Sequence, residues 1–131
     1  MYLIDTNIWL ERLLDQERSQ EVGDFLNKVT TDNIKITDFA FHSICVILDN
    51  LGEREALNRF VDDLFLQSEV NLISLPPALI DEILEAANQF NLDFDDAYQY
   101  VAASRYDFQI ISFDTDFDRT KKGRKTPSEV L

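Results

Sequence analysis

Three stretches of this chain place aspartates beside an apolar segment in a way that could do chemistry: MYLIDTNIWL, LDFDDAYQYVAA and IISFDTDFDRT. Asp5 and Asp114 follow short apolar runs, and Asp96 lies where a helix is expected to begin. Carboxylates that come together raise one another's pKa, so several stay ionised only beside a counter-charge. Mg²⁺ or Mn²⁺, which prefer hard oxygen ligands, would supply that charge and could activate water against a phosphodiester.

The elements that would position these aspartates alternate between strands and helices. Apolar patterns predict short strands at 2–4, 34–36, 70–75 and 108–112. Helical spacing and capping residues predict helices at 7–14, 19–29, 37 or 38 to 51, 54–66, 76 or 77 to 87, and 93 or 95 to 102. This alternation predicts an α/β fold, a three-layer α/β/α sandwich with a central, mainly parallel sheet. The carboxyl ends of parallel strands meet at one edge, so Asp5, Asp96 and Asp114 are expected to converge there.

The composition indicates one folded domain over residues 1–131. Hydrophobic residues make up 45% of the chain, which argues against disorder. The single cysteine excludes an internal disulfide framework and a cysteine-based zinc cluster. No leader or membrane-spanning stretch is recognisable, so a soluble cytoplasmic protein with no membrane contact is expected.

The charge is strongly negative overall but uneven along the sequence. The formal net charge is −13, which repels nucleic acid at long range. Five of the 12 basic residues nevertheless fall within seven positions, and these are Arg119, Lys121, Lys122, Arg124 and Lys125. This basic run is either a solvated tail or a local binding patch for RNA phosphates. Its position one residue after Asp118, beside the expected metal site, favours phosphate binding.

Each group of aspartates also has a purely structural interpretation. Acids such as Asp95 and Asp96 in a first helical turn favour the helix dipole and cap free amides. Asp114 could simply end a strand, and Asp116 could be solvated. The expected convergence of three groups at one sheet edge favours the metal-site interpretation over these separate ones.

Three motifs, LIDTNIWLE, DDAYQYVAA and IISFDTDFD, resemble those of the PIN domain, the nuclease domain of VapC-type toxins. They span residues 2–118 in the family's order. The resemblance implies a parallel sheet flanked by helices and Mg²⁺- or Mn²⁺-dependent hydrolysis of RNA by an activated water. It also implies a homodimer and an antitoxin partner that inserts a segment into the acidic groove.

Position by position, the resemblance implies that Asp5, Asp96 and Asp114 hold the metal and are catalytic, with Asp116 as a fourth catalytic acid. Further candidates to line the site are Thr6, Asn7 and Asp95.

The chain departs from the family where a helix glutamate is expected, near FAFHSICVIL, because no acid occurs between Asp38 and Asp49. His42 or Ser43 stands at about that position, and His42 either faces the site or is a half-buried structural residue. Imidazole binds Mg²⁺ weakly compared with a carboxylate. We therefore expect altered metal preference or reduced activity.

Two other functions stay open at this stage. A PIN-like binding or regulatory module with weak or lost nuclease activity would account for the missing glutamate. A phosphatase with an aspartate nucleophile is less consistent with the sequence, because the D-x-D pattern of such enzymes follows the first strand and here it follows the last. The target RNA cannot be read, since phosphate contacts carry no base code.

Overall fold

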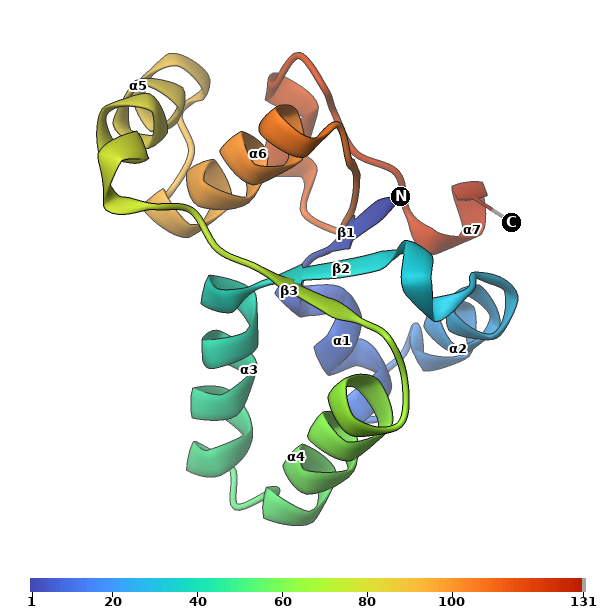
Figure 1. Ribbon diagram of the computed structural model, residues 1–131. Coiled ribbons are helices and arrows are strands. Elements are labelled where there is room, and N and C mark those ends of the chain that lie inside the picture. Colours follow the sequence, from blue (N-terminus) through green and yellow to red (C-terminus); the bar gives the residue numbers. More distant parts are fainter. Residues whose placement is uncertain (131) are drawn as a thin grey trace.

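The computed structural model describes residues 1–130 and contains a four-stranded, fully parallel sheet (Figure 1). The strands stand in the order β3-β2-β1-β4. Their bounds are β1 (Tyr2–Ile4), β2 (Ile34–Thr37), β3 (Asn71–Ile73) and β4 (Gln109–Ile111). The register pairs Leu3 with Lys35 on one side and with Ile110 on the other. The predicted parallel α/β sheet is confirmed.

Helices cover both faces of the sheet (Figure 1). Within residues 1–130 they are α1 (Thr6–Leu13), α2 (Ser19–Lys28), α3 (Asp38–Asn50), α4 (Arg54–Val61), α5 (Ile80–Phe90), α6 (Phe94–Tyr106) and α7 (Pro127–Val130). None of these helices combines the length and the apolar character needed to cross a membrane.

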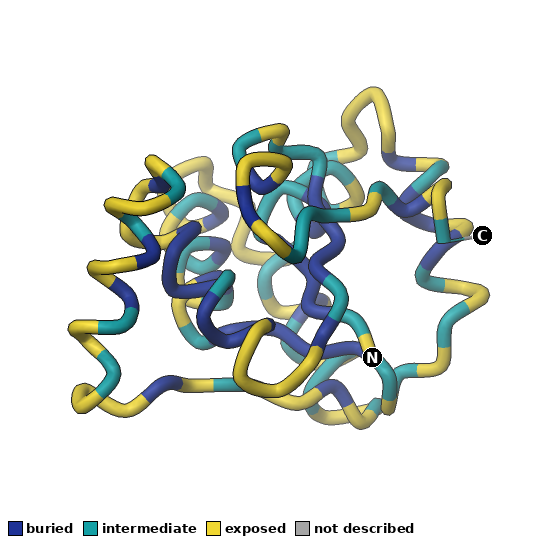
Figure 2. Tube along the Cα trace, turned by 90° about the horizontal axis from the view of Figure 1, so that it is seen from above, coloured by how far each residue is buried: buried dark blue, intermediate teal, exposed yellow. Residues whose placement is uncertain are grey.

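The core consists of two apolar layers, because successive strand residues point to opposite faces of the sheet. Leu3 and Ile110 pack with α5 and α6 on one face. Ile4 and Ile111 pack on the other face with residues of α1 to α4. Figure 2 shows buried segments running through the middle of the molecule, with exposed turns around them. The three-layer arrangement is therefore a consequence of the alternation within each short strand.

Several boundaries differ from the expected ones. The helix predicted over 54–66 ends as α4 at Val61 and continues as a π-helix over Asp62–Leu66. In this arrangement the ring of Phe65 lies 5.2 Å from that of Phe41. A short 3-10 helix, Pro77–Leu79, precedes α5, and two further 3-10 helices cover Thr31–Asn33 and Thr115–Arg119. Helix α7 was not predicted from the sequence.

The carboxyl ends of β1 and β4 lead into the segments that carry Asp5 and Asp114. Asp5 follows β1 and its backbone N–H donates to the carbonyl of Ile111, the last residue of β4, at 3.0 Å. Asp114 lies three residues beyond Ile111 and begins the 3-10 helix Thr115–Arg119. The fold therefore brings Asp5 and Asp114, which lie far apart in the sequence, to the same edge of the sheet, as expected.

Candidate metal centre

Asp5 is buried and held by four hydrogen-bond donors. It is 5% exposed. Its Oδ1 accepts from the backbone N–H of Thr6 and from Gln99 Nε2, both at 2.7 Å. Its Oδ2 accepts from the Ser112 hydroxyl at 2.6 Å and from Asn7 Nδ2 at 3.2 Å. These contacts fix the orientation of the carboxylate, and the one from Thr6 also begins helix α1.

Burial and hydrogen bonding have opposite effects on the pKa of Asp5. Burial raises this pKa, and the charge of Asp114 raises it further. The hydrogen bonds from Ser112, Gln99 and Thr6 lower it, because they favour the ionised form. The net result is a raised pKa, so the anion at Asp5 would be stabilised by a nearby cation.

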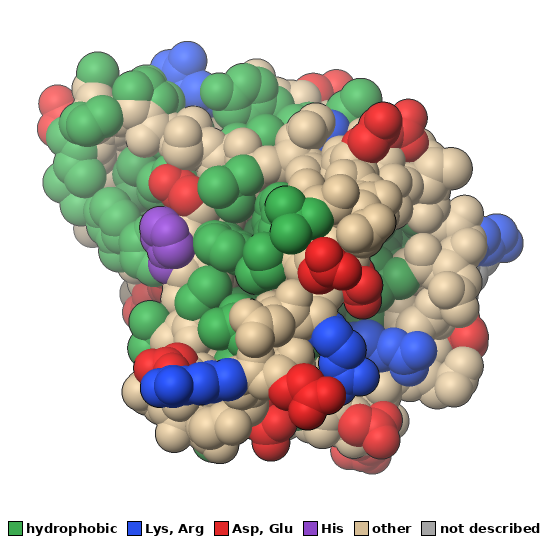
Figure 3. Space-filling model, turned by 60° about the horizontal axis from the view of Figure 1, so that its bottom comes forward, with side chains coloured by type: hydrophobic (Ala, Val, Ile, Leu, Met, Phe, Trp, Pro, Cys, Tyr) green, Lys and Arg blue, Asp and Glu red, His purple; other side chains and the backbone are tan. Residues whose placement is uncertain are grey.

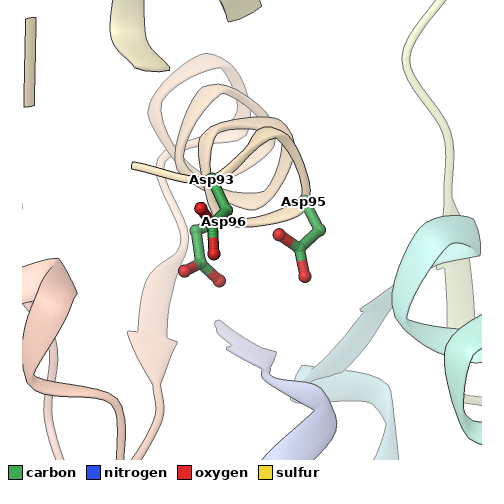
Figure 4. Close-up of side chains that lie close together, drawn as sticks. All are labelled: Asp93, Asp95 and Asp96. Carbon is green, nitrogen blue, oxygen red and sulfur yellow. The ribbon is translucent and has the colours of Figure 1, made fainter. Parts of the chain in front are cut away.

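Three more aspartates project from the start of α6 to one side of the helix (Figure 4). Carboxylate oxygens of Asp93, Asp95 and Asp96 lie within 4.8 Å of one another. Asp93 occupies the N-cap position, yet its side chain accepts no capping hydrogen bond. Helix capping alone therefore does not account for this group.

A second group joins α6 to the segment after β4. Carboxylate oxygens of Asp96, Asp114 and Asp116 also lie within 4.8 Å of one another. Opposite oxygens around a Mg²⁺ ion stand about 4.2 Å apart, so oxygens with this spacing could surround one small divalent ion. Asp5 belongs to neither group, although its charge is close enough to raise the pKa of Asp96.

The carboxyl group of Asp96 also has a strongly raised pKa. Asp96 is 8% exposed. Burial, followed by the charges of Asp5, Asp95, Asp114 and Asp93, raises its pKa to about 8. In the absence of a cation this carboxyl is therefore largely protonated at neutral pH. A bound divalent cation would favour its ionised form, so the all-oxygen donor set fits Mg²⁺ or Mn²⁺.

The sequence matches the PIN domain over residues 2–123. This chain belongs to the PIN domain family. A search of the curated proteins finds no match.

Several solved structures have a similar fold. VapC20 of Mycobacterium tuberculosis, a sarcin-ricin loop cleaving toxin, is 15% identical with a TM-score of 0.77, over 90% of this chain and 93% of that one. FitAcB of Neisseria gonorrhoeae is 18% identical with a TM-score of 0.74, over 98% and 99%. A toxin–antitoxin complex from Klebsiella pneumoniae is 21% identical with a TM-score of 0.71, over 97% and 98%. At these identities the likeness concerns the fold.

Gln99 and Ser112 position acids of the candidate site, and neither was singled out from the sequence. Gln99 is 4% exposed and donates to Asp5, while its own Oε1 has no hydrogen-bond partner among residues 1–130. Ser112 donates to Asp5 and accepts from the backbone N–H of Asp114, so one hydroxyl links two acids. The position of Gln99, three residues after Asp96 and on the same side of α6, was the available signal.

His42 does not take the place of the expected glutamate in the acidic cluster. Its side chain is exposed on α3, and neither acidic group within residues 1–130 includes it. It lines a surface cavity with Ser43, Phe39 and Tyr98. His42 therefore lines this cavity and is not among the clustered acids, and a role for it at the metal site stays a prediction. Ser43 lies there as well.

The basic run is largely engaged with acids of the same region. Arg119 pairs with Asp116 at 3.0 Å, Lys122 with Asp107 at 3.5 Å, and Arg124 with Asp118 at 3.1 Å. Arg119 also donates to the backbone carbonyls of residues 90 and 91, at the end of α5. These contacts brace the loop that carries Asp114 and Asp116.

Lys121 and Lys125 are the two exposed members of the basic run that form no ion pair within residues 1–130. Phosphate binding by all five basic residues stays a prediction. For Arg119, Lys122 and Arg124 it would require an existing ion pair to rearrange.

Proposed function

We propose that this protein is a divalent-cation-dependent endoribonuclease that acts as the toxin of a type II toxin–antitoxin pair. The observation that carries the proposal is the convergence of Asp96, Asp114 and Asp116, with Asp5 beside them, at the carboxyl edge of a PIN sheet. PIN domains are generally nucleases, and the structural neighbours include a toxin and a toxin–antitoxin complex. Mg²⁺ or Mn²⁺ is the proposed cofactor, and RNA in the cytoplasm the proposed substrate.

Each acid has a defined part in this proposal. Asp96, Asp114 and Asp116 would hold the cation, with Asp5 as a fixed anion beside it. When bound, a divalent cation would supply an activated water and neutralise charge on the attacked phosphate. In hydrolysis a water would add to phosphorus while one P–O bond of the RNA backbone breaks. Gln99 and Ser112 keep Asp5 in one orientation throughout.

Cleavage of a pooled RNA substrate tests the proposal. We expect cleavage with Mn²⁺ or Mg²⁺, none with a chelator, and a loss of about 100-fold or more in Asp114→Asn, which keeps the shape but removes the charge. The matched control is Asp81→Asn, an exposed acid in the first turn of α5. Equal cleavage by Asp114→Asn and wild type would contradict the proposed site.

A second candidate is a PIN-like binding or regulatory module with weak or lost cleavage. It is favoured by α3, where the acid nearest the sheet edge, Asp38, accepts a hydrogen bond from Tyr98 and no acid follows until Asp49. Calorimetric titration with Mn²⁺, with Asp5→Asn as the control, separates the two. Absence of both metal binding and RNA cleavage would favour the module.

An antitoxin and a second copy of this chain are the proposed protein partners. An antitoxin arginine inserted among the acids would imitate the charge of the cation and so inhibit the enzyme. Light scattering on the purified protein tests for the homodimer. Co-expression with a neighbouring small reading frame tests for the antitoxin, which should suppress cleavage and raise the mass of the complex.

A further inference from the structure

A shallow cavity of about 490 Å³ lies beside the acidic cluster, between the first three turns of α3 and Tyr98 of α6. Its wall is mainly apolar, with Phe39 and Val46, and polar groups come from Asp38, His42 and Ser43. Figure 3 shows the histidine, the only one in the chain, at the edge of a hydrophobic surface with acidic side chains close by. Mostly apolar walls with a few polar groups are typical of ligand sites.

Aromatic rings form one side of this surface. The ring of Phe39 lies 5.5 Å from that of Tyr98 and 6.0 Å from that of Phe94. Phe39 is 36% exposed and Phe94 40% exposed, so both rings present area to solvent. Exposed aromatic side chains of this kind are the platforms on which unpaired nucleic-acid bases stack.

The aromatic surface includes a residue of the turn that carries the clustered acids. Phe94 stands between Asp93 and Asp95 in the first turn of α6, the turn that also carries Asp96. One turn further along α6, the Tyr98 hydroxyl donates to Asp38 Oδ1 at 2.7 Å, which ties α6 to the start of α3. A phosphodiester held at the acids would therefore have a neighbouring nucleoside over the cavity.

The charge of the surroundings decides which part of the nucleotide fits. Asp38 and the acidic turn of α6 repel a phosphate, whereas the face of a base is neutral and stacks on Phe39. The Asp38 carboxylate accepts hydrogen bonds, so it favours a base with an exocyclic amino group. His42 and Ser43 offer further donors or acceptors to a base edge.

We propose that this cavity is a nucleobase subsite, in which a base next to the scissile phosphodiester stacks on Phe39 and Phe94 and is read by Asp38, His42 and Ser43. The inference rests on the proposed ribonuclease function and names the part of the substrate that this surface recognises. It assigns a specificity role to His42, in place of a metal-binding one.

The test uses the full chain and one RNA that it cleaves, with Mn²⁺ present. Two modified RNAs carry an abasic residue, one on the 5′ side and the other on the 3′ side of the cleaved bond. For wild type, KM should rise about tenfold with one of these two RNAs, because a stacked base is lost. Phe39→Ala and, separately, Phe94→Ala should raise KM for intact RNA to a similar extent and remove the penalty of the abasic residue. The control is Tyr106→Ala, an exposed aromatic at the other end of α6, which should retain the full penalty.

A second readout does not depend on cleavage. Anisotropy with the same RNAs bound to Asp114→Asn should show the abasic penalty, and Phe39→Ala in that background should remove it. An unchanged abasic penalty in both phenylalanine variants overturns the subsite and leaves the ribonuclease proposal intact. Absence of RNA cleavage by the wild type overturns the ribonuclease proposal and, with it, the subsite that rests on it. If Phe39→Ala or Phe94→Ala lowers the mass of an oligomer but leaves KM and the abasic penalty unchanged, the surface is a protein–protein contact. That result overturns the subsite.

Discussion

Asp96→Asn should stabilise the protein at neutral pH when no metal is bound. Asp96 is 8% exposed, and burial together with the charges of Asp5, Asp95 and Asp114 raises its pKa to about 8. The corresponding value in an unfolded chain is 3.8. Between these values the folded protein keeps a proton that the unfolded chain has released. Asparagine resembles the protonated acid in shape and carries no charge that must be neutralised.

The magnitude follows from linkage between proton binding and unfolding. The pKa of Asp96 is higher in the folded protein than in the unfolded chain, so the protonated carboxyl contributes its full stabilisation below pH 3.8. This contribution is lost as the pH rises towards about 8. The slope is at most about 1.4 kcal/mol per pH unit, which gives an upper limit of about 4 kcal/mol at pH 7. Water and counter-ions at the open side of the site reduce this figure. We expect Asp96→Asn to gain about 1–3 kcal/mol at pH 7 and almost nothing at pH 4.

Urea unfolding followed by circular dichroism, in chelator and at several pH values, measures this gain. Asp81→Asn, the exposed acid in the first turn of α5, is the matched control and should change the free energy of unfolding by less than about 0.5 kcal/mol. Added Mn²⁺ should stabilise wild type by about 1.4 kcal/mol at ten times its Kd and should stabilise Asp96→Asn less. A gain that is equal at pH 4 and pH 7, or a loss at pH 7, would refute the reasoning.

Three further variants probe the supports of the site. Ser112→Ala removes the 2.6 Å donor to Asp5, which raises the pKa of Asp5 further. Mn²⁺ binding measured by calorimetry should therefore require a higher pH than in wild type, and an unshifted pH profile would contradict this. Tyr98→Phe leaves the buried N–H of Leu75 without its 2.7 Å acceptor and should lower the free energy of unfolding by about 1–3 kcal/mol in urea. Thr37→Ala removes the side-chain cap of α3 and should cost about 1 kcal/mol in the same assay, whereas no loss would show that the cap is dispensable.

The sheet and the convergence of the acids could be predicted because they depend on local patterns. Each strand is a short apolar run, and the residue after β1 is an aspartate whatever the neighbouring strands are. The π-helix at Asp62–Leu66 was not predictable in this way, since the apolar spacing of residues 54–66 suits an ordinary helix. Its wider turn became visible only with the packing of Phe65 against Phe41.

The supports of the site depend on contacts between distant parts of the chain. Gln99 meets Asp5 across 94 residues and Ser112 meets it across 107. Apart from the three-residue spacing between Asp96 and Gln99, a single sequence gives no sign of these contacts. For His42, the sequence indicates the approximate position along α3 but not the direction of the side chain. The rotation of α3 about its axis decides whether His42 faces the acids or the neighbouring cavity.

The arrangement of charge explains why this site would depend on an exchangeable cation. Around the site, and within residues 1–130, the ion pairs of lysine and arginine reach Asp118 and only one of the three proposed cation ligands, Asp116. They do not reach Asp5, Asp96 or Asp114. The donors to Asp5 are neutral, so they orient the carboxylate without cancelling its charge. A permanent cation at the centre would relieve the repulsion and also compete with a metal ion. The neutral donors inside the site and the basic residues outside it leave this repulsion in place. Burial, followed by the repulsion, therefore raises the pKa of Asp96.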